Sequence, residues 1–231
     1  MARVSKPAGD TVDHIEDWIF DLDNTLYPAT ANLFPQIDKR MKAFIGQLLK
    51  LSPDDAFKLQ KDYYWKYGTT LRGLMLNHDI APDEFIEYVH DIDHSILSHN
   101  ADLDAALAAL PGRKFIYTNG SERHAVNVMD RLGVSRHFDG IFDIRASDYI
   151  PKPEPAPYAT LIARHAITPT RAIMFEDIHR NLKPAADLGM TTVWVKSDEH
   201  TPRPDEDLSH CGHITDDLVS WLREMTPRKP L

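Results

Sequence analysis

The sequence predicts an α/β fold, a three-layer doubly wound parallel sheet with an α-helical segment inserted after its first strand. Three observations support this prediction. From residue 100 onward, short apolar runs typical of buried strands alternate with stretches of helical period. Residues 28–99 are almost entirely helical in pattern and contain no convincing strand. Acidic, hydroxyl and basic side chains follow several strands, at the sheet edge where open α/β folds bind ligands.

The first strand and the inserted helices come first in the chain. Residues 18–22 form an apolar run typical of a buried strand. Helical period begins near residue 34, where apolar side chains recur at spacings of three and four. Ser52 and Pro53, followed by two acids, are typical of a helix N-terminus, and Pro82 with two acids after it opens another helix.

The rest of the chain alternates between the two element types. Glycines at 133 and 189 follow helical stretches and are typical helix ends. Such alternation implies parallel strands with helices on both faces of the sheet. We expect helices at 102–110, 122–132, 155–165, 181–188 and 216–225, and strands at 114–118, 141–144, 171–175 and 191–195.

These patterns suggest a division into two domains. Residues 15–27 and 100–226 would form a Rossmann-like core, and residues 28–99 a helical domain. Polar residues at 1–14 and the end of the chain at 227–231 would be flexible tails.

Composition excludes several classes of function. The 231 residues include 26 Lys and Arg against 35 Asp and Glu, a net charge of −9, which disfavours binding to a nucleic-acid polymer. The single cysteine, Cys211, cannot form an intrachain disulfide and fits a reducing compartment. No stretch approaches the roughly 18 apolar residues of a membrane span. We therefore expect a cytoplasmic protein with no membrane partner, either a monomer or a homodimer.

Asp21 and Asp23 are the most informative residues, because they end the first apolar strand two positions apart. Residues two apart on a strand point to the same side. Two acids on one side repel each other unless a positive charge lies nearby, and a divalent cation with oxygen ligands is the usual solution. The pair therefore offers a nucleophile, a proton-transfer group and a metal site.

Three further strand ends carry polar groups. Thr118, Asn119 and Gly120 follow the second strand, where a hydroxyl and backbone N–H groups could hold a phosphate, although an ordinary turn has the same pattern. Lys152 lies between two prolines and could be a fixed cation or a solvated loop lysine. Glu176 and Asp177 could complete a metal site with the first pair, or Asp177 could simply cap a helix.

Taken together and in this order, the four motifs resemble those of the haloacid dehalogenase superfamily. The resemblance covers about residues 15–197, including a helical cap placed directly after the first motif. It implies a Mg²⁺-dependent phosphotransferase in which Asp21 is the nucleophile, Asp23 the general acid and base, and Thr118 and Lys152 hold the phosphoryl group. It also implies that Asp21, the Asp23 backbone carbonyl and Asp177 hold Mg²⁺, with Glu176 close by or bound through water.

A narrower resemblance, to the pyrimidine 5′-nucleotidase group, comes from residues 63–74 of the cap together with 20–28 and 181–185. Aromatic side chains at 63, 64 and 67 could stack on a base, although packing within the cap explains them at least as well. Thr69, Thr70 and Arg72, expected in a turn between two glycines, are candidate substrate contacts, with Arg72 able to bind a phosphate through two hydrogen bonds.

The predicted function is hydrolysis of nucleoside 5′-monophosphates, UMP or CMP in particular, through an aspartyl-phosphate. Another small-metabolite phosphatase, acting on pyridoxal phosphate, phosphoglycolate or a sugar phosphate, remains an alternative. So does a mutase similar to β-phosphoglucomutase, which shares the four motifs. A non-catalytic binding module is disfavoured because every motif keeps its reactive side chain.

Two histidine groups are not expected to bind metal. His90 and His94 have a spacing that can hold an ion, but a solvated helix surface explains them better. His210, Cys211 and His213 lie too close together along the chain to converge on one ion.

Overall fold

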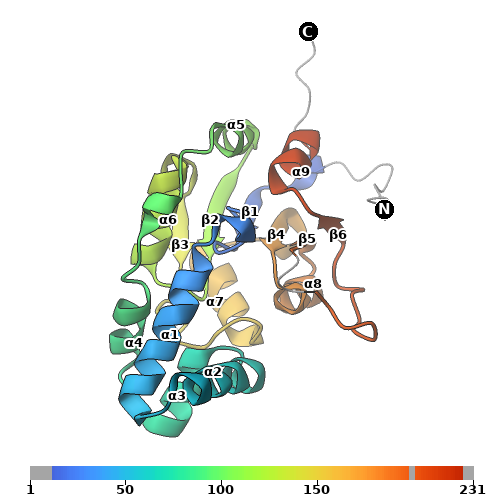
Figure 1. Cartoon of the computed structure of the whole chain (residues 1–231). Helices are drawn as coiled ribbons and strands as arrows, with labels where there is room; N and C mark the ends of the chain where they lie inside the picture. The colour runs from blue at the N-terminus through green and yellow to red at the C-terminus, as the bar shows by residue number, and fades with distance from the viewer. Residues whose placement is uncertain (1–11, 198–200, 226–231) are drawn as a thin grey trace.

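The computed structural model describes residues 12–197 and 201–225 of the chain (Figure 1). Most of the predicted tails, residues 1–11 and 227–231, lie outside this range. A sheet occupies the middle of the molecule, with one group of helices around it and a second group, α1–α4, beyond one of its edges.

The sheet has six strands in the order β3-β2-β1-β4-β5-β6, and every neighbouring pair is parallel. The central strand is β1, in which Trp18 pairs with Lys114 of β2 on one side and with Ile173 of β4 on the other. Because the strands are parallel, their carboxyl ends meet at one edge. The strands are β1 (Asp17–Phe20), β2 (Arg113–Tyr117), β3 (Gly140–Phe142), β4 (Ala172–Glu176), β5 (Thr191–Val195) and β6 (His213–Thr215).

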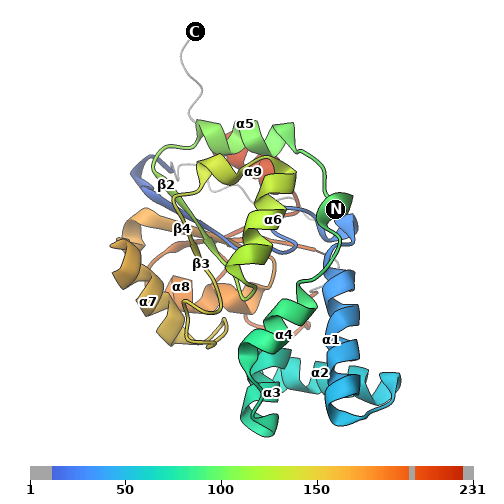
Figure 2. The same cartoon turned by 90° about the vertical axis from the view of Figure 1, so that its left-hand side faces the viewer.

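Two apolar layers cover the sheet, as the alternation of strand side chains requires. Trp18 and Phe20 face one layer, and Ile19 faces the other. Figure 2 shows α6 and α7 on opposite sides of the strands. The first layer contains α5 (Ala101–Ala109), α6 (Glu122–Leu132) and α9 (Leu218–Met225), and the second contains α7 (Pro155–His165) and α8 (Lys183–Asp187). The predicted three-layer α/β architecture is confirmed.

The helices between β1 and β2 pack mainly on one another, and we call α1–α4 the helical insert. Ser52 caps α2 by accepting a hydrogen bond from the Asp55 N–H, as its sequence context predicts. Ile37, Tyr63 and Phe85 belong to an apolar cluster of the insert. The helices are α1 (Phe34–Leu49), α2 (Pro53–Tyr67), α3 (Thr70–His78) and α4 (Pro82–Val89).

The structure differs from the sequence prediction at three elements. The segment around Thr69 is not a turn across the site, because Thr69 caps α3 and Thr70 begins that helix. The helix expected at 181–188 is divided into a 3₁₀ turn and the short α8. Strand β6 had no predicted counterpart. The 3₁₀ turns are η1 (Val12–His14), η2 (Ala29–Ala31), η3 (His94–Ile96), η4 (Ser135–His137), η5 (Pro169–Arg171) and η6 (His179–Leu182).

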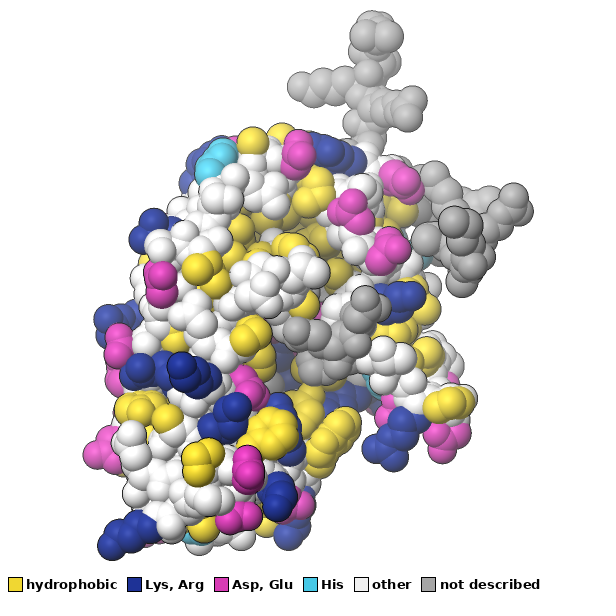
Figure 3. Space-filling view, viewed as in Figure 1, with side chains coloured by type: hydrophobic (Ala, Val, Ile, Leu, Met, Phe, Trp, Pro, Cys, Tyr) yellow, Lys and Arg dark blue, Asp and Glu magenta, His cyan; other side chains and the backbone are white. Residues whose placement is uncertain are grey.

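The charged side chains on one face of the molecule are mixed, and the described helices are unlike membrane spans (Figure 3). On the face shown in Figure 3, basic and acidic side chains are interspersed rather than gathered into one large patch. Among the described residues, no helix is both long enough and apolar enough to span a bilayer.

Candidate active site

Asp21 lies directly after the central strand, at the sheet edge where the carboxyl ends meet. Its backbone N–H donates to the carbonyl of Phe175, so the pairing of β1 with β4 extends to the residue itself. Its carboxylate is buried and accepts a hydrogen bond from the Thr25 hydroxyl, with 3.3 Å between Thr25 Oγ1 and Asp21 Oδ2. Asp21 is therefore held in place by both its backbone and its side chain.

Lys152 provides the positive charge beside Asp21. Its Nζ lies 2.6 Å from Asp21 Oδ1, 3.5 Å from Glu176 Oε1 and 2.9 Å from the carbonyl oxygen of Tyr117. Burial alone would lower the pKa of Lys152, but the carboxylates around it raise that pKa, so the side chain is an ammonium. Its own N–H donates to Asn119 Oδ1 at 2.9 Å, which joins the lysine loop to the end of β2.

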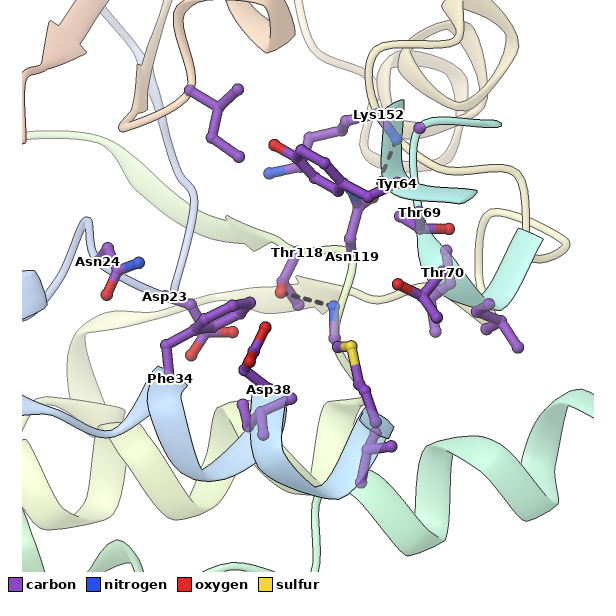
Figure 4. Close-up of a pocket in the computed structure, with 18 of the residues that line it drawn as sticks. Asp23, Asn24, Phe34, Asp38, Tyr64, Thr69, Thr70, Thr118, Asn119 and Lys152 are labelled. Carbon is purple, nitrogen blue, oxygen red and sulfur yellow. Dashed lines mark hydrogen bonds between the residues drawn. The ribbon is translucent and has the colours of Figure 1, made fainter. Parts of the chain in front are cut away.

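Thr118 and Gly120 form the turn at the end of β2. Thr118 Oγ1 accepts a hydrogen bond from the Gly120 N–H at 2.9 Å (Figure 4). The backbone N–H of Thr118 donates to the carbonyl oxygen of Phe142. The hydroxyl retains its proton for donation to an incoming oxygen. Thr118, Asn119, Gly120 and Lys152 all line the same cavity as Asp21.

Glu176 and Asp177 complete a buried acidic cluster with Asp21. One carboxylate oxygen from each of the three lies within 4.8 Å of the others. Burial and the negative charge of Asp21 raise the pKa of Glu176 to about 8, and burial with the charge of Glu176 raises that of Asp177 well above its usual range. Asn181 donates a hydrogen bond to Glu176 and orients it.

This cluster fits a hard divalent cation. If its three carboxylates are all ionised, the cluster and Lys152 together carry a net charge of −2, which a divalent cation would neutralise. Carboxylate oxygens are the ligands that Mg²⁺ uses in proteins. The side chain of Asp23 is not in the cluster.

Asp23 is oriented by two donors that sequence reasoning did not identify. Tyr27 Oη donates to Asp23 Oδ1 at 2.5 Å, and His124 Nε2 lies 2.8 Å from the same oxygen. Burial would raise the pKa of Asp23, but interaction with His124 and the hydrogen bonds lower it to about 2. Tyr27 could have been found from its i+4 spacing to Asp23, whereas nothing in the sequence places His124 nearby.

A cavity of about 330 Å³ opens from these groups into the helical insert. Asp38 of α1 and Thr70 of α3 also line it, and in Figure 4 Thr70 lies on the far side of Thr118 from Asp23. Thr69 and Thr70 line it as the sequence suggested, but Arg72 is not among the described residues that do. The backbone N–H of Arg72 bonds to Thr69 Oγ1 in the first turn of α3.

The insert contributes a small polar group to the cavity wall. Gln60 Nε2 and Lys61 Nζ both donate to Asp38 Oδ1, at 2.8 and 2.9 Å. Gln60 is buried, and its Oε1 has no hydrogen-bond partner among the residues that the structure describes. Of the three tyrosines singled out in the sequence, Tyr64 lines the cavity, whereas Tyr63 and Tyr67 pack within the insert.

Comparison with known proteins decides the family. A model of haloacid dehalogenase-like hydrolases matches residues 18–189. The chain belongs to this family.

Several known proteins are similar to this chain over most of its length. Phosphate metabolism protein 8 of Saccharomyces cerevisiae is 27% identical over 194 residues, which cover 76% of this chain and 60% of the yeast protein. The chain thus spans about 60% of the length of that relative. A HAD phosphatase from Thermococcus onnurineus shares the fold, with a TM-score of 0.62, 19% identity and coverage of 91% of this chain and 97% of the other. L-2-haloacid dehalogenase from Xanthobacter autotrophicus does so with a TM-score of 0.57, 16% identity and coverage of 90% and 97%.

As a haloacid dehalogenase-like hydrolase, the protein brings the predicted motif residues together at one sheet edge. Asp21, Thr118, Lys152, Glu176 and Asp177 are buried around a common point, and Asp23 lies at the cavity wall. One of the histidines set aside in the sequence is placed differently from expectation. His94 is buried and bonds to His124, so a solvated surface was the wrong interpretation for it.

Proposed function

We propose that the protein is a Mg²⁺-dependent phosphomonoesterase that hydrolyses nucleoside 5′-monophosphates, pyrimidine nucleotides in particular. The observation that supports this most is the position of Asp21. Its carboxylate lies between the Lys152 ammonium and two further buried acids, at one end of a cavity enclosed by the insert.

In the proposed reaction, an Asp21 oxygen attacks phosphorus, and the bond from phosphorus to the leaving oxygen breaks. Lys152 and the Thr118 hydroxyl would donate to the phosphoryl oxygens, which reduces the repulsion between an anionic nucleophile and an anionic ester. Asp23 is a carboxylate in the free protein, so it would first take up a proton when the anionic ester binds beside it. It would give that proton to the leaving oxygen and later remove one from the water that releases phosphate from Asp21.

Mg²⁺ would be held by Asp21 and Asp177, with Glu176 beside it, and when bound it supplies positive charge to the phosphoryl group. The same carboxylates without a cation would carry more negative charge than Lys152 balances. This excess of three clustered carboxylates over one ammonium supports the proposed metal requirement.

The cavity supports a leaving group with both an apolar and a polar part. Its wall is mostly apolar, and the insert adds the polar side chains of Asp38, Gln60 and Lys61 to it. The unpartnered Gln60 Oε1 is an acceptor for an N–H or O–H donor, and the edge of a uracil or cytosine base carries an N–H donor. Tyr64 could stack on the base, with Thr69 and Thr70 near the sugar.

Two features favour a phosphatase over a haloacid dehalogenase of the same fold. In the superfamily that the motifs resemble, dehalogenases lack the second acid of the first motif. This chain has that acid, Asp23, two residues after Asp21. The acidic cluster would also have no purpose in a reaction without a metal. A β-phosphoglucomutase-like mutase shares these groups and stays as the second candidate.

Phosphate release from a panel of esters, with Mg²⁺ and with EDTA, tests the proposal. The panel contains UMP, CMP, dTMP, AMP, GMP, pyridoxal phosphate, phosphoglycolate and several sugar phosphates. We expect release that depends on Mg²⁺ and has the highest kcat/KM for UMP and CMP. Preference for another ester would keep the chemistry and reject the nucleotide assignment. Absence of release from all of them, with isomerisation of a sugar phosphate, would instead support the mutase.

A further inference from the structure

We propose that His124 is a positioning residue that fixes the carboxylate of Asp23 relative to residues 118–120, the loop that would hold the phosphate. The inference rests on the proposed phosphomonoesterase reaction, in which Asp23 transfers protons to and from the reacting oxygens. The carboxylate of Asp23 would then be oriented by a side chain of α6.

Both donors to Asp23 reach the same oxygen atom. Tyr27 Oη and His124 Nε2 lie 2.5 and 2.8 Å from Oδ1, and no hydrogen bond joins Oδ2 to any described residue. A carboxylate that is held at one oxygen cannot turn freely about its own axis. Oδ2 is thus the oxygen left to meet a leaving group in the cavity, which Asp23 lines.

The two donors join Asp23 to different parts of the molecule. Tyr27 is four residues from Asp23 in the same turn, so it moves together with the carboxylate. His124 comes from the first turn of α6, and the loop that precedes this helix carries Thr118 and Asn119. His124 therefore ties the proton-transfer group to the loop that would hold the phosphate.

His124 is itself held on every side. Its side chain is fully buried, and its backbone N–H bonds to the Ser121 hydroxyl that caps α6. Its Nδ1 lies 3.0 Å from His94 Nε2. The ring of His90 stacks on it, with 4.6 Å between ring centroids and 8° between ring planes. A ring fixed in this way can define the position of the group it contacts.

The residues that hold His124 come from the segment where the chain returns from the insert to the core. His90 ends α4 and His94 begins η3, and His90 Nδ1 also lies 3.0 Å from Ser121 Oγ. A continuous set of contacts thus runs from the end of the insert through His124 to Asp23. The position of Asp23 consequently depends on how this return segment packs.

Two variants separate positioning from mere support of the fold. In His124→Asn the amide can replace Nδ1 and keep a contact with His94, but it is too short to reach Asp23. In His124→Gln the longer side chain can place an N–H donor where Nε2 lies. His137→Asn is the control, because His137 Nε2 bonds to Asp104 at 2.7 Å in a similar His–Asp pair of the core outside the cavity lining.

The measurement is kcat/KM for p-nitrophenyl phosphate and for an alkyl phosphate such as UMP or glycerol 2-phosphate. Nitrophenolate leaves without a proton, whereas an alkoxide needs one, so only the alkyl ester reports on the proton transfer by Asp23. We expect His124→Asn to lose about 100-fold on the alkyl ester and less than about 10-fold on the aryl ester. His124→Gln should recover most of the loss, and His137→Asn should affect both esters alike.

Equal losses on the two esters in a folded His124→Asn protein, or no loss on either, would overturn the proposal. If that variant does not fold, His124→Met replaces it, because Met matches Gln in length and lacks only the donor. A crystal structure of the variant gives an answer that needs no activity. An Asp23 carboxylate that keeps its orientation would reject the inference, and one that turns would support it even if the wild-type protein hydrolyses neither ester.

Discussion

At the scale of single residues, the central feature is a lysine buried among carboxylates. Lys152 has Asp21 at 2.6 Å and Glu176 at 3.5 Å, and Asp177 also lies close enough to raise its pKa. A buried ammonium is tolerated only when opposite charges compensate it, and here the carboxylates outnumber it. The site therefore has room for further positive charge, and a bound cation would compensate the carboxylates that Lys152 leaves unbalanced.

Replacing the proposed nucleophile tests its role directly. Asp21→Asn keeps the size of the side chain and removes its negative charge, so we expect phosphate release to fall by at least about 1,000-fold. Asp187→Asn, at an exposed acid of α8 paired with Lys183, is the control and should be fully active. Thermal denaturation would show that both variants are folded. An active Asp21→Asn protein would remove the nucleophile assignment.

Magnesium is expected to stabilise the protein in the absence of any substrate. A ligand that binds only the folded state at about 100 times its Kd adds about 2.7 kcal/mol of stability. In a chain of this size that corresponds to a rise in Tm of about 5–10 °C. Asp177→Asn removes one proposed ligand and should reduce the rise. An equal rise with NaCl at the same ionic strength would show that the effect is screening rather than binding.

The sequence predicts the charged residues of the site better than the residues that orient them. Asp21, Thr118, Lys152 and Glu176 could be assigned to one edge, because parallel strands bring their carboxyl ends together. His124 could not, since its partner Asp23 is 101 positions away and a histidine within an amphipathic helix has no distinctive pattern. The same reason applies to Asp38 and Gln60, which meet only when α1 packs on α2.

At the scale of elements, the close contact between α2 and α3 determines the shape of the insert. Gly73 of α3 lies against the ring of Tyr63 of α2, and a Cβ there would lie 2.3 Å from Tyr63 Cγ. The absent side chain lets the two helices approach closely. This approach places Thr69 and Thr70, at the start of α3, in the wall of the cavity.

Gly73→Ala should therefore destabilise the protein by about 1–3 kcal/mol, as overpacking of a dense core usually does. Gly46→Ala in α1 is the matched control, because its nearest neighbour would be the Leu51 carbonyl oxygen at an acceptable 3.4 Å. That change should be neutral or stabilise by up to about 1 kcal/mol through helix propensity. Chemical denaturation of both variants measures the two effects. Similar losses of stability in both would contradict the packing argument.

The elements show where local pattern is sufficient and where it fails. Ser52 and Pro53 correctly predicted the start of α2, because a cap depends on adjacent residues alone. The two glycines around residues 69–72 suggested a turn, but burial of Leu71 and Leu74 against the rest of the insert makes the segment helical. Tertiary packing decided the outcome there.

At the scale of the whole molecule, the insert is joined to the core by contacts on two sides. Arg145 forms ion pairs with Asp83 and Glu87 of α4. On the other side, the guanidinium of Arg180 lies over the rings of Tyr64 and Trp65, at 4.6 and 5.3 Å from their centroids. Cation–π contacts of this kind contribute about 0.5–2 kcal/mol each. They would hold α2 above the cavity.

Arg180→Ala should loosen this side of the insert without altering the proposed reacting groups. We expect a rise in KM of about 3- to 30-fold for a nucleotide with a smaller change in kcat, and faster hydrogen exchange in α2. Arg223→Ala, which breaks an ion pair with Asp102 between α9 and α5, is the control. Unchanged exchange in α2 would show that Arg180 does not hold the insert.

The sequence indicated a parallel sheet but not the order of its strands. Alternating elements require crossover connections, yet many orders satisfy them, and β1 reaches its central position only through pairing with β2 and β4. The strand order therefore had to come from the structure.

That central position has a consequence for how the chain folds. Strand β1 is made first, but its two neighbours begin only at Arg113 and Ala172. During synthesis the apolar run of Trp18, Ile19 and Phe20 gains its first neighbour only with β2 and its second only with β4. Pairings between such distant segments form slowly and leave aggregation-prone intermediates exposed. The strand that positions the proposed nucleophile thus precedes the other described strands in the chain but is enclosed on both sides only once β4 has been made.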